Sequence, residues 1–417
     1  MNRGRIVFLC HFSNSKVREN LGLKWLGIRN VINKLRGFPS LSYDDLAIWV
    51  SDFIQEFEKH PEYEFHIVAP HKGMIKEFQD FVINGINYHF FKCDSNIIRD
   101  WYNSRFLIEE KNNYKKNRER ISKIVTVINP DLVLLCGAEN PYYSSGVLDI
   151  NNIPVYVILQ TLLNDPKRIE MGVGTPYRRK IEADVFNHAH YFSASAEKNI
   201  NKIREFNSHA VMLPVPFPTH RPLIEKCDKK DYDFVFFSRG ISANKGIEDV
   251  LKAMAIVSKR YKGVSLNVIG SCGVVYRKHL DAMIASLGIA PNVHFSGFYD
   301  KIEDMYADVA KAKAVVVPGI TAGLNSTVRE AMFMGMPTLC YQTSATDNIN
   351  KERTCLLTAP MGDIEDLAKQ MFLTIDNPDR AIGIAANGKE YAEKKFGNKA
   401  IVDKLLDNCR LIIEGKV

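Results

Sequence analysis

The sequence contains no long hydrophobic run. Although 46% of its 417 residues are hydrophobic, no stretch approaches the ~18 consecutive apolar residues that a membrane-spanning helix needs. Residues 1–5 lead directly into a short apolar stretch, 6–10, with neither the apolar core nor the small-residue cleavage site of a signal peptide. These absences argue against a membrane-spanning protein, and we expect a cytoplasmic one.

Metal-binding patterns are also lacking. The eight cysteines lie far apart, without a CxxC pair or a His/Cys cluster at metal-ligand spacing, which favours reduced thiols. The only Asp-x-Asp stretch, 231–233, directly precedes a predicted strand, where the solvated start of a strand is a better interpretation than a magnesium site. We therefore expect neither a metal nor a cofactor.

Excess positive charge is confined to the N-terminal part of the chain. The net charge is +7, and residues 1–38 carry eight Lys or Arg against the single acid Glu19, which leaves 47 basic and 47 acidic residues elsewhere. A local patch of this kind favours an anionic surface or substrate. A nucleic-acid binder more often interleaves base-stacking aromatics with charge across a whole domain, so we expect no nucleic-acid partner.

Residues 17–36 have the spacing of an amphipathic helix. Large apolar side chains recur there at helical intervals, with lysines and arginines nearby. Two interpretations stay open. The segment contacts the anionic inner face of a membrane peripherally, or it packs against the N-terminal sheet, with Gly22 and Gly27 lowering its helix propensity.

Short runs of β-branched and aromatic residues recur at intervals that leave room for helices between them. The predicted strands are 6–10, 65–69, 132–136, 155–159, 234–237, 266–269, 293–295 and 314–317. This rhythm predicts a parallel α/β fold. Four prolines in 214–222 forbid a helix or central strand and indicate a linker. We expect two doubly wound Rossmann-like domains, 1–213 and 214–395, whose strands carry ligands at their carboxyl ends and face a central cleft.

Two cations follow the first strand of the second half. Arg239 comes two positions after the apolar run 234–237. Lys245 directly precedes Gly246, at the predicted start of a helix. Cations at a strand's carboxyl end beside a helix N-terminus suit a diphosphate and the charge that develops on it as a leaving group. Taken alone, the two residues are equally well interpreted as solvated surface charges.

Other turns in the C-terminal half of the chain are also able to contact a ligand. Gly270 lies in a glycine-bearing turn after a strand, and Phe298 follows a strand that ends in a tight turn, although each is weak by itself. The strongest segment is 315–337, where a buried strand leads into a Gly/Asn/Ser loop and a helix that starts near Ser326. Glu330 in that helix can accept hydrogen bonds from two vicinal hydroxyls, or simply compensate the helix dipole.

In order and spacing these stretches resemble the retaining GT-B glycosyltransferases of the glycogen-synthase-like, glycosyltransferase family 4 kind, over about residues 231–400. The resemblance implies that Arg239 and Lys245 bind the donor diphosphate and that Glu330, the second Glu of the family's Glu-x7-Glu motif, binds the ribose. The first Glu of that motif falls on Ala322 here, which leaves the contact with the donor sugar open. Residues 396–417 resemble the C-terminal helix that crosses back to the N-terminal domain in such enzymes.

The site residues divide into three groups. Catalytic roles fall on Arg239, Lys245 and Glu330. Donor-binding roles fall on Gly270, Phe298, Thr321, Gly323, Leu324, Asn325, Ser326 and Thr327. The acceptor or cleft residues follow strands of the first half and are His11, Ser13, Asn14, Glu139 and Gln160, where the family's usual Gly-Gly loop after the first strand is absent.

The resemblance implies a hexosyltransferase that moves a sugar from a UDP- or GDP-sugar to a glycan or lipid-linked acceptor, with retention, in cell-surface polysaccharide biosynthesis. It implies no metal, because the two cations and the helix amides already neutralise the diphosphate. A GT-B nucleotide-sugar epimerase, which needs no acceptor, and a non-catalytic nucleotide-sugar-binding protein are the alternatives. Product analysis separates the first, and binding without turnover identifies the second.

Overall fold

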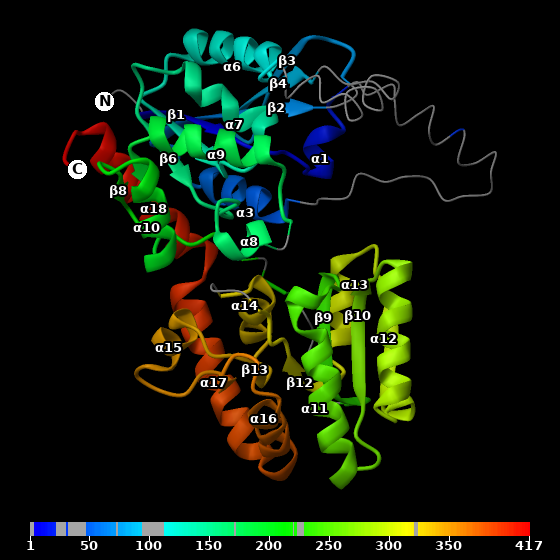
Figure 1. The fold of residues 1–417 in the computed structure, drawn as a ribbon. Coiled ribbons are helices and arrows are strands. Elements are labelled where there is room, and N and C mark those ends of the chain that lie inside the picture. Colours follow the sequence, from blue (N-terminus) through cyan, green and yellow to red (C-terminus); the bar gives the residue numbers. More distant parts are fainter. Residues whose placement is uncertain are drawn as a thin grey trace. The chain divides into compact units, whose positions relative to one another are not determined.

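The computed structural model describes residues 4–21, 31, 47–71, 74–93, 112–170, 172–219, 221–222, 229–320 and 324–417. The chain forms two compact units (Figure 1). Unit 1 combines Met1–Pro218 with Asn398–Val417, and unit 2 is Thr219–Gly397. Most of the amphipathic segment predicted at 17–36 lies outside the described residues.

Unit 1 is built on an eight-stranded sheet in the order β3-β4-β2-β1-β5-β6-β7-β8. Every neighbouring pair is parallel except β3 and β4, which form an antiparallel hairpin at one edge. The strands are β1 Gly4–Leu9, β2 Tyr63–His71, β3 Phe78–Ile83, β4 Ile86–Lys92, β5 Leu132–Cys136, β6 Val155–Ile158, β7 Tyr191–Phe192 and β8 Val211–Met212.

Helices cover both faces of this sheet. They are α1 Ser15–Arg18, α3 Ile48–Phe57, α6 Lys115–Ile128, α7 Pro141–Ser144, η1 Ser145–Asp149, α8 Pro166–Glu170, α9 Pro176–His188, α10 Glu197–Phe206 and α18 Asn398–Ile413. Side chains of β1 alternate between two cores. Ile6 and Phe8 pack in the core that includes α3 and α18, and Val7 and Leu9 pack in the core that includes α6 and α9. A strand buried on both faces is hydrophobic throughout, which explains its continuous apolar run.

Residues at the end of the chain complete unit 1. Helix α18 packs against α3, and its Asn408 is buried. The Asn408 side-chain amide donates to the hydroxyl of Tyr156 at 3.2 Å and to the carbonyl of Leu213 at 3.3 Å. These bonds join α18 to β6 and to the proline-rich segment after β8, so the first core includes residues about 400 positions apart in the sequence.

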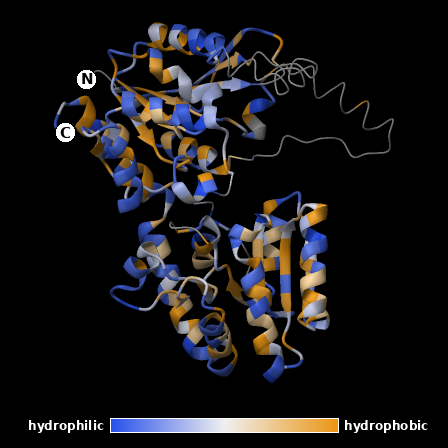
Figure 2. Ribbon diagram, in the orientation of Figure 1, coloured by the Kyte–Doolittle hydropathy of each residue, from blue (hydrophilic) through white to orange (hydrophobic). Residues whose placement is uncertain are grey.

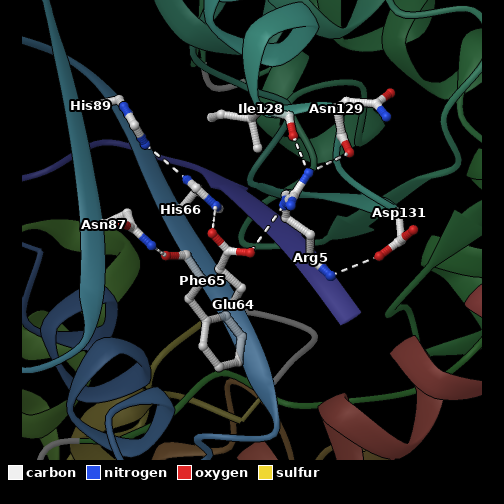
Figure 3. A network of polar contacts seen from close by, with 9 residues as sticks. All are labelled: Arg5, Glu64, Phe65, His66, Asn87, His89, Ile128, Asn129 and Asp131. Carbon is white, nitrogen blue, oxygen red and sulfur yellow. Dashed lines mark hydrogen bonds and ion pairs between the residues drawn. The ribbon is translucent and has the colours of Figure 1, made fainter. Parts of the chain in front are cut away.

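A polar network ties the amino ends of β1 and β2 to neighbouring elements (Figure 3). Arg5 pairs with Glu64 at 3.1 Å and donates to the carbonyl of Ile128 at the end of α6 at 2.7 Å. His66 lies between Glu64 and His89, with nitrogen–nitrogen contact to His89 at 2.9 Å. Burial and the neighbouring His89 lower the pKa of His66 to about 4, so its ring is neutral at pH 7. The network lies at the amino edge of the strands, opposite the edge where a doubly wound sheet binds ligands.

Unit 2 is built on a six-stranded, wholly parallel sheet in the order β11-β10-β9-β12-β13-β14. Its strands are β9 Tyr232–Gly240, β10 Leu266–Ser271, β11 Val293–Gly297, β12 Ala312–Val316, β13 Thr338–Tyr341 and β14 Leu357–Ala359. Its helices are η2 Ala243–Lys245, α11 Ile247–Arg260, α12 Val274–Ser286, η3 Ala290–Asn292, α13 Ile302–Val309, α14 Ser326–Phe333, α15 Ser344–Asn350, α16 Ile364–Asp376 and α17 Pro378–Lys395. The central strands of both units are predominantly hydrophobic (Figure 2).

The eight strands predicted from the sequence are all present, some longer than expected. The prediction omitted the β3–β4 hairpin and the short strands β7, β8, β13 and β14. Within the described part of the chain, no helix combines the length and the apolar character needed to cross a bilayer.

Gly270 holds β10 close to β9. Its φ is +141°, and a Cβ at this position would overlap the carbonyl oxygen of Ser238. No side chain fits between the two strands here, and an L-residue would also be strained by this backbone conformation.

We expect Gly270→Ala to destabilise the protein by roughly 3 kcal/mol or more, because strain and overlap with backbone add. Urea unfolding monitored by circular dichroism measures this. Gly263→Ala is the matched control, because a Cβ there meets no atom within 4 Å. Equal stability of the two variants would contradict the close approach.

Candidate functional site

The carboxyl edge of the unit 2 sheet gathers the loops that follow β9 and β12. Arg239 lies near the end of β9, and Lys245 ends the short helix η2 that follows. Gly246 then has φ +81°, and a Cβ there would overlap the carbonyl oxygen of Pro318. The amide of Ile320 also donates to the carbonyl of Asn244 at 3.0 Å. These contacts place the Lys245 loop against the loop after β12.

Helix α14 begins at this edge, after the β12 loop. Asn325 is its N-cap, and the Asn325 side chain accepts a hydrogen bond from the amide of Thr327 at 3.3 Å. The cap fixes where the helix starts. Glu330 is therefore held in the second turn of α14, with one face of the helix buried against the unit 2 core through Val328 and Ala331.

Glu330 is a half-buried carboxyl group close to cations and to a hydroxyl group. Burial raises its pKa to about 7, while the charge of Arg329, a hydrogen bond from Tyr306 and the charges of Arg239 and Lys245 act in the opposite direction. The structure thus brings Arg239 and Lys245 within electrostatic reach of Glu330. A strongly perturbed carboxyl with specific charge partners is typical of binding and catalytic sites.

Tyr306 is a member of this site that sequence reasoning missed. It is 1% exposed and comes from α13, whereas the motif residues follow β9 and β12. Its hydroxyl group lies close enough to the Glu330 carboxyl group to lower the pKa of that group. No sequence pattern marked Tyr306, because a tyrosine in an amphipathic helix usually belongs to the core.

The other predicted donor-binding residues have different surroundings. Phe298 is 54% exposed directly after β11, and Ser326 is exposed at the start of α14. Leu324 is half-buried, and Thr327 is buried. Thr321 and Gly323, together with Ala322, lie outside the described residues.

The aspartates of the Asp-x-Asp stretch lie at the amino end of β9, away from Arg239. Asp233 accepts from the Ser265 amide at 2.9 Å and pairs with Lys313 at 2.8 Å, and Asp231 pairs with Lys229 at 3.3 Å. Both carboxylates serve the local structure. Across the described ranges, no group of three or more His, Cys, Asp or Glu side chains is arranged to hold a metal ion.

The loop after β1 forms part of the carboxyl edge of unit 1. Ser13 is buried, and its hydroxyl accepts from the Ala47 amide at 2.7 Å. Asn14 caps α1 by accepting from the Val17 amide at 3.2 Å. The hydrogen bonds that these two side chains accept stabilise the conformation of the loop.

His11 in the same loop contacts α7. Its Nδ1 lies 2.6 Å from the hydroxyl of Tyr142. Burial raises the pKa of Tyr142 well above its ordinary value, so this hydroxyl keeps its proton and can donate to the imidazole.

Glu139 follows β5 at this same edge. It is 4% exposed, and its Oε1 accepts from the Asn140 amide group at 3.1 Å. Its Oε2 is buried without a partner among the described residues. Burial raises the pKa of Glu139 to about 7. Gln160, after β6, is exposed.

Residues 223–394 match the family described as "Glycosyl transferases group 1". A stretch of 158 residues is 24% identical to 2-deoxystreptamine glucosyltransferase from Streptomyces kanamyceticus, and it covers 38% of this chain and 40% of that relative. The chain therefore aligns with less than half the length of this curated relative.

Two solved structures resemble the whole chain. Sucrose-phosphate synthase from Thermosynechococcus elongatus has a TM-score of 0.72 at 13% identity, with 99% of this chain and 100% of that chain covered. HepE from Anabaena, in complex with UDP and glucose, has a TM-score of 0.62 at 14% identity, with 98% and 99% covered. At these identities the likeness shows the fold alone.

The two parallel, doubly wound units and the full-length likeness to these structures define a GT-B fold. The match to the glycosyl transferases group 1 family, over residues 223–394, falls within unit 2.

We expect Glu330→Gln to stabilise the unliganded protein at pH 8. The folded pKa of about 7 lies above the ordinary glutamate value of 4.5, so wild-type stability falls as pH rises from 4.5 through 7. The Gln variant carries no charge to desolvate, and its advantage should grow from near zero at pH 5 to about 1–3 kcal/mol at pH 8. Urea unfolding at the two pH values measures it. A stability difference that does not change with pH would exclude a raised pKa at Glu330.

Proposed function

We propose that the protein transfers a hexose-type sugar from a UDP- or GDP-sugar to a glycan or lipid-linked acceptor, with retention of anomeric configuration, in cell-surface polysaccharide biosynthesis. One observation carries the proposal. The half-buried Glu330 carboxyl group lies in the field of Arg239 and Lys245 at the carboxyl edge of the unit 2 sheet. The two cations suit the diphosphate of a nucleoside diphosphate, and the carboxyl group suits its ribose hydroxyls.

Arg239 and Lys245 neutralise the diphosphate. As the bond between the sugar and the diphosphate breaks, negative charge grows on the departing phosphate, and two fixed cations stabilise that charge more than they stabilise the intact donor. Arg239 and Lys245 are well suited to this role because contacts of Asn244 and Gly246 hold the loop between β9 and α11 in place.

Glu330 accepts hydrogen bonds from the ribose hydroxyls. A carboxylate has two oxygens and can bind two vicinal hydroxyls. The loop 319–327 holds the sugar, in part through backbone groups, because Ala322 offers no polar side chain. Unit 1 binds the acceptor through the carboxyl edge of its own sheet, beside His11 and Glu139.

Substitutions at Glu330 and Arg239 should have different effects, one on nucleotide affinity and the other on turnover. Glu330→Gln keeps the shape of the side chain but loses a charged acceptor, so affinity for UDP or GDP should fall about tenfold or more. Arg239→Ala should lower kcat beyond any loss of binding, because its charge acts mainly in the transition state. Calorimetry and initial rates with a panel of UDP- and GDP-hexoses measure both.

Glu303→Gln and Arg380→Ala are the matched controls, since both side chains are exposed on unit 2. Wild-type nucleotide affinity and turnover in both site variants, with unchanged melting temperatures, would overturn the donor site. Analysis of the products distinguishes transfer from epimerisation, because an epimerase changes the donor sugar without an acceptor.

Nucleotide binding should not require a divalent cation. The two cations of the site already balance the diphosphate charge, and we expect calorimetric affinity for UDP or GDP to change less than about threefold, under about 0.7 kcal/mol, on addition of EDTA. Loss of binding on chelation that Mg²⁺ restores would refute metal independence.

A further inference from the structure

Three arginines at the carboxyl edge of unit 1 have no carboxylate partner within the described ranges. Arg168 lies in α8, and Arg178 and Arg179 lie in the first turn of α9. The next residue, Lys180, is paired with Asp184 at 2.7 Å. The charge of Arg168 acts on the buried carboxyl groups of Glu139 and Glu182, but no described carboxylate forms an ion pair with any of the three guanidinium groups.

Backbone and amide oxygens hold two of these guanidinium groups in place. Arg178 donates from Nε to the carbonyl of Glu139 and from a terminal nitrogen to the side-chain oxygen of Asn140, each at 3.0 Å. Arg179 donates to the carbonyl of Gly174 at 2.7 Å. These oxygens are uncharged, so they orient the groups without cancelling their charge. Each arginine has five N–H donors, and several stay available to a ligand.

The loop between α8 and α9 brings Arg168 to the same place. The amide of Val173 donates to the Arg168 carbonyl at 2.8 Å, and the Val173 carbonyl accepts from Arg179 at 3.4 Å. The charges of Arg168 and Arg178 both act on the carboxyl group of Glu139. One buried side chain is thus a common neighbour of two arginines from different helices.

The carboxyl group of Glu139 indicates a ligand independently of the arginines. Its side chain is buried, and its Oε2 has no hydrogen-bond partner in the described part of the chain. A buried polar atom without a partner destabilises the folded protein, so a ligand that supplies a hydrogen bond to it recovers that cost. Because burial raises the pKa of Glu139 to about 7, the carboxyl group is partly protonated near neutral pH and can donate to an oxyanion. An arriving anion raises this pKa further and favours the donating form.

We propose that Arg168, Arg178, Arg179 and Glu139 bind an oxyanion, a phosphate or carboxylate group, carried by the acceptor. The planar guanidinium group matches the geometry of both anions. The cluster lies where β5 and β6 end, at the edge that a doubly wound sheet uses for ligands. Assigning the oxyanion to the acceptor rests on the proposed function, whereas the anion site itself does not. Acceptors are then anionic sugars or lipid phosphates, and their uncharged analogues bind weakly.

The test uses the full chain with Arg239→Ala and Lys245→Ala, which weaken binding of phosphate to unit 2. Calorimetry with inorganic phosphate, glucose 6-phosphate, glucuronate and methyl glucoside compares anionic and neutral probes. We expect phosphate or one of the two anionic sugars to bind and methyl glucoside not to bind. Preference for glucose 6-phosphate or for glucuronate tells whether the group is a phosphate or a carboxylate.

Adding Arg168→Gln and Arg179→Gln should weaken anion binding at least tenfold, whereas the matched control Lys180→Gln should leave it unchanged. Glu139→Gln, whose amide still donates, should keep anion affinity near that of the parent, and Glu139→Ala should lower it. Absence of anion binding, or binding that the arginine substitutions do not weaken, would overturn the proposal.

Binding of UDP to the chain with intact Arg239 and Lys245 separates this result from the proposed function. With Arg168→Gln and Arg179→Gln alone, UDP affinity should match wild type. If wild-type protein binds anions through the arginine cluster but does not bind UDP, the donor-site proposal fails and the anion site stands. Melting temperatures of all variants show whether a lost signal reflects unfolding.

Discussion

Parallel pairing of the central strands is the constraint on which both candidate sites depend. In a parallel sheet all strands end at one edge, so the loops that follow them meet even when they are far apart in the sequence. In unit 2 this edge collects Arg239, Lys245 and the helix that carries Glu330. In unit 1 the same geometry collects the loop of His11 and the loop of Glu139. The antiparallel β3–β4 hairpin lies at the margin of its sheet and leaves this arrangement intact.

Close packing of backbone against backbone then determines where the site loops lie. Gly246 touches the carbonyl of Pro318, and Gly270 touches the carbonyl of Ser238. At both positions the space that a side chain would occupy is filled by the protein's own backbone. The glycines therefore serve the packing of loops and strands first, and any contact between these turns and a ligand depends on that packing.

Each unit keeps a carboxyl group near cations, fully buried at Glu139 and half-buried at Glu330. Burial raises the pKa of Glu330 and of Glu139 to about 7, and in each case the surrounding cations only partly offset the desolvation. Such groups lower the stability of the unliganded protein at neutral pH and above. A ligand that supplies the missing hydrogen bonds restores this stability, which is consistent with the two binding roles proposed for these carboxyl groups.

The sequence by itself determined the doubly wound class, because a buried parallel strand must be apolar on both faces and its length is visible in a run such as Leu132–Cys136. It also placed Arg239 at the carboxyl end of a strand. The short strands β7 and β8, of two residues each, carry too little pattern to be predicted. Only the tertiary structure decided that Tyr306 meets Glu330 and that Arg178 meets Glu139, because the partners are 24 and 39 positions apart and on different elements. Local periodicity reports which face of an element is buried, whereas the partner on that face depends on how the elements pack.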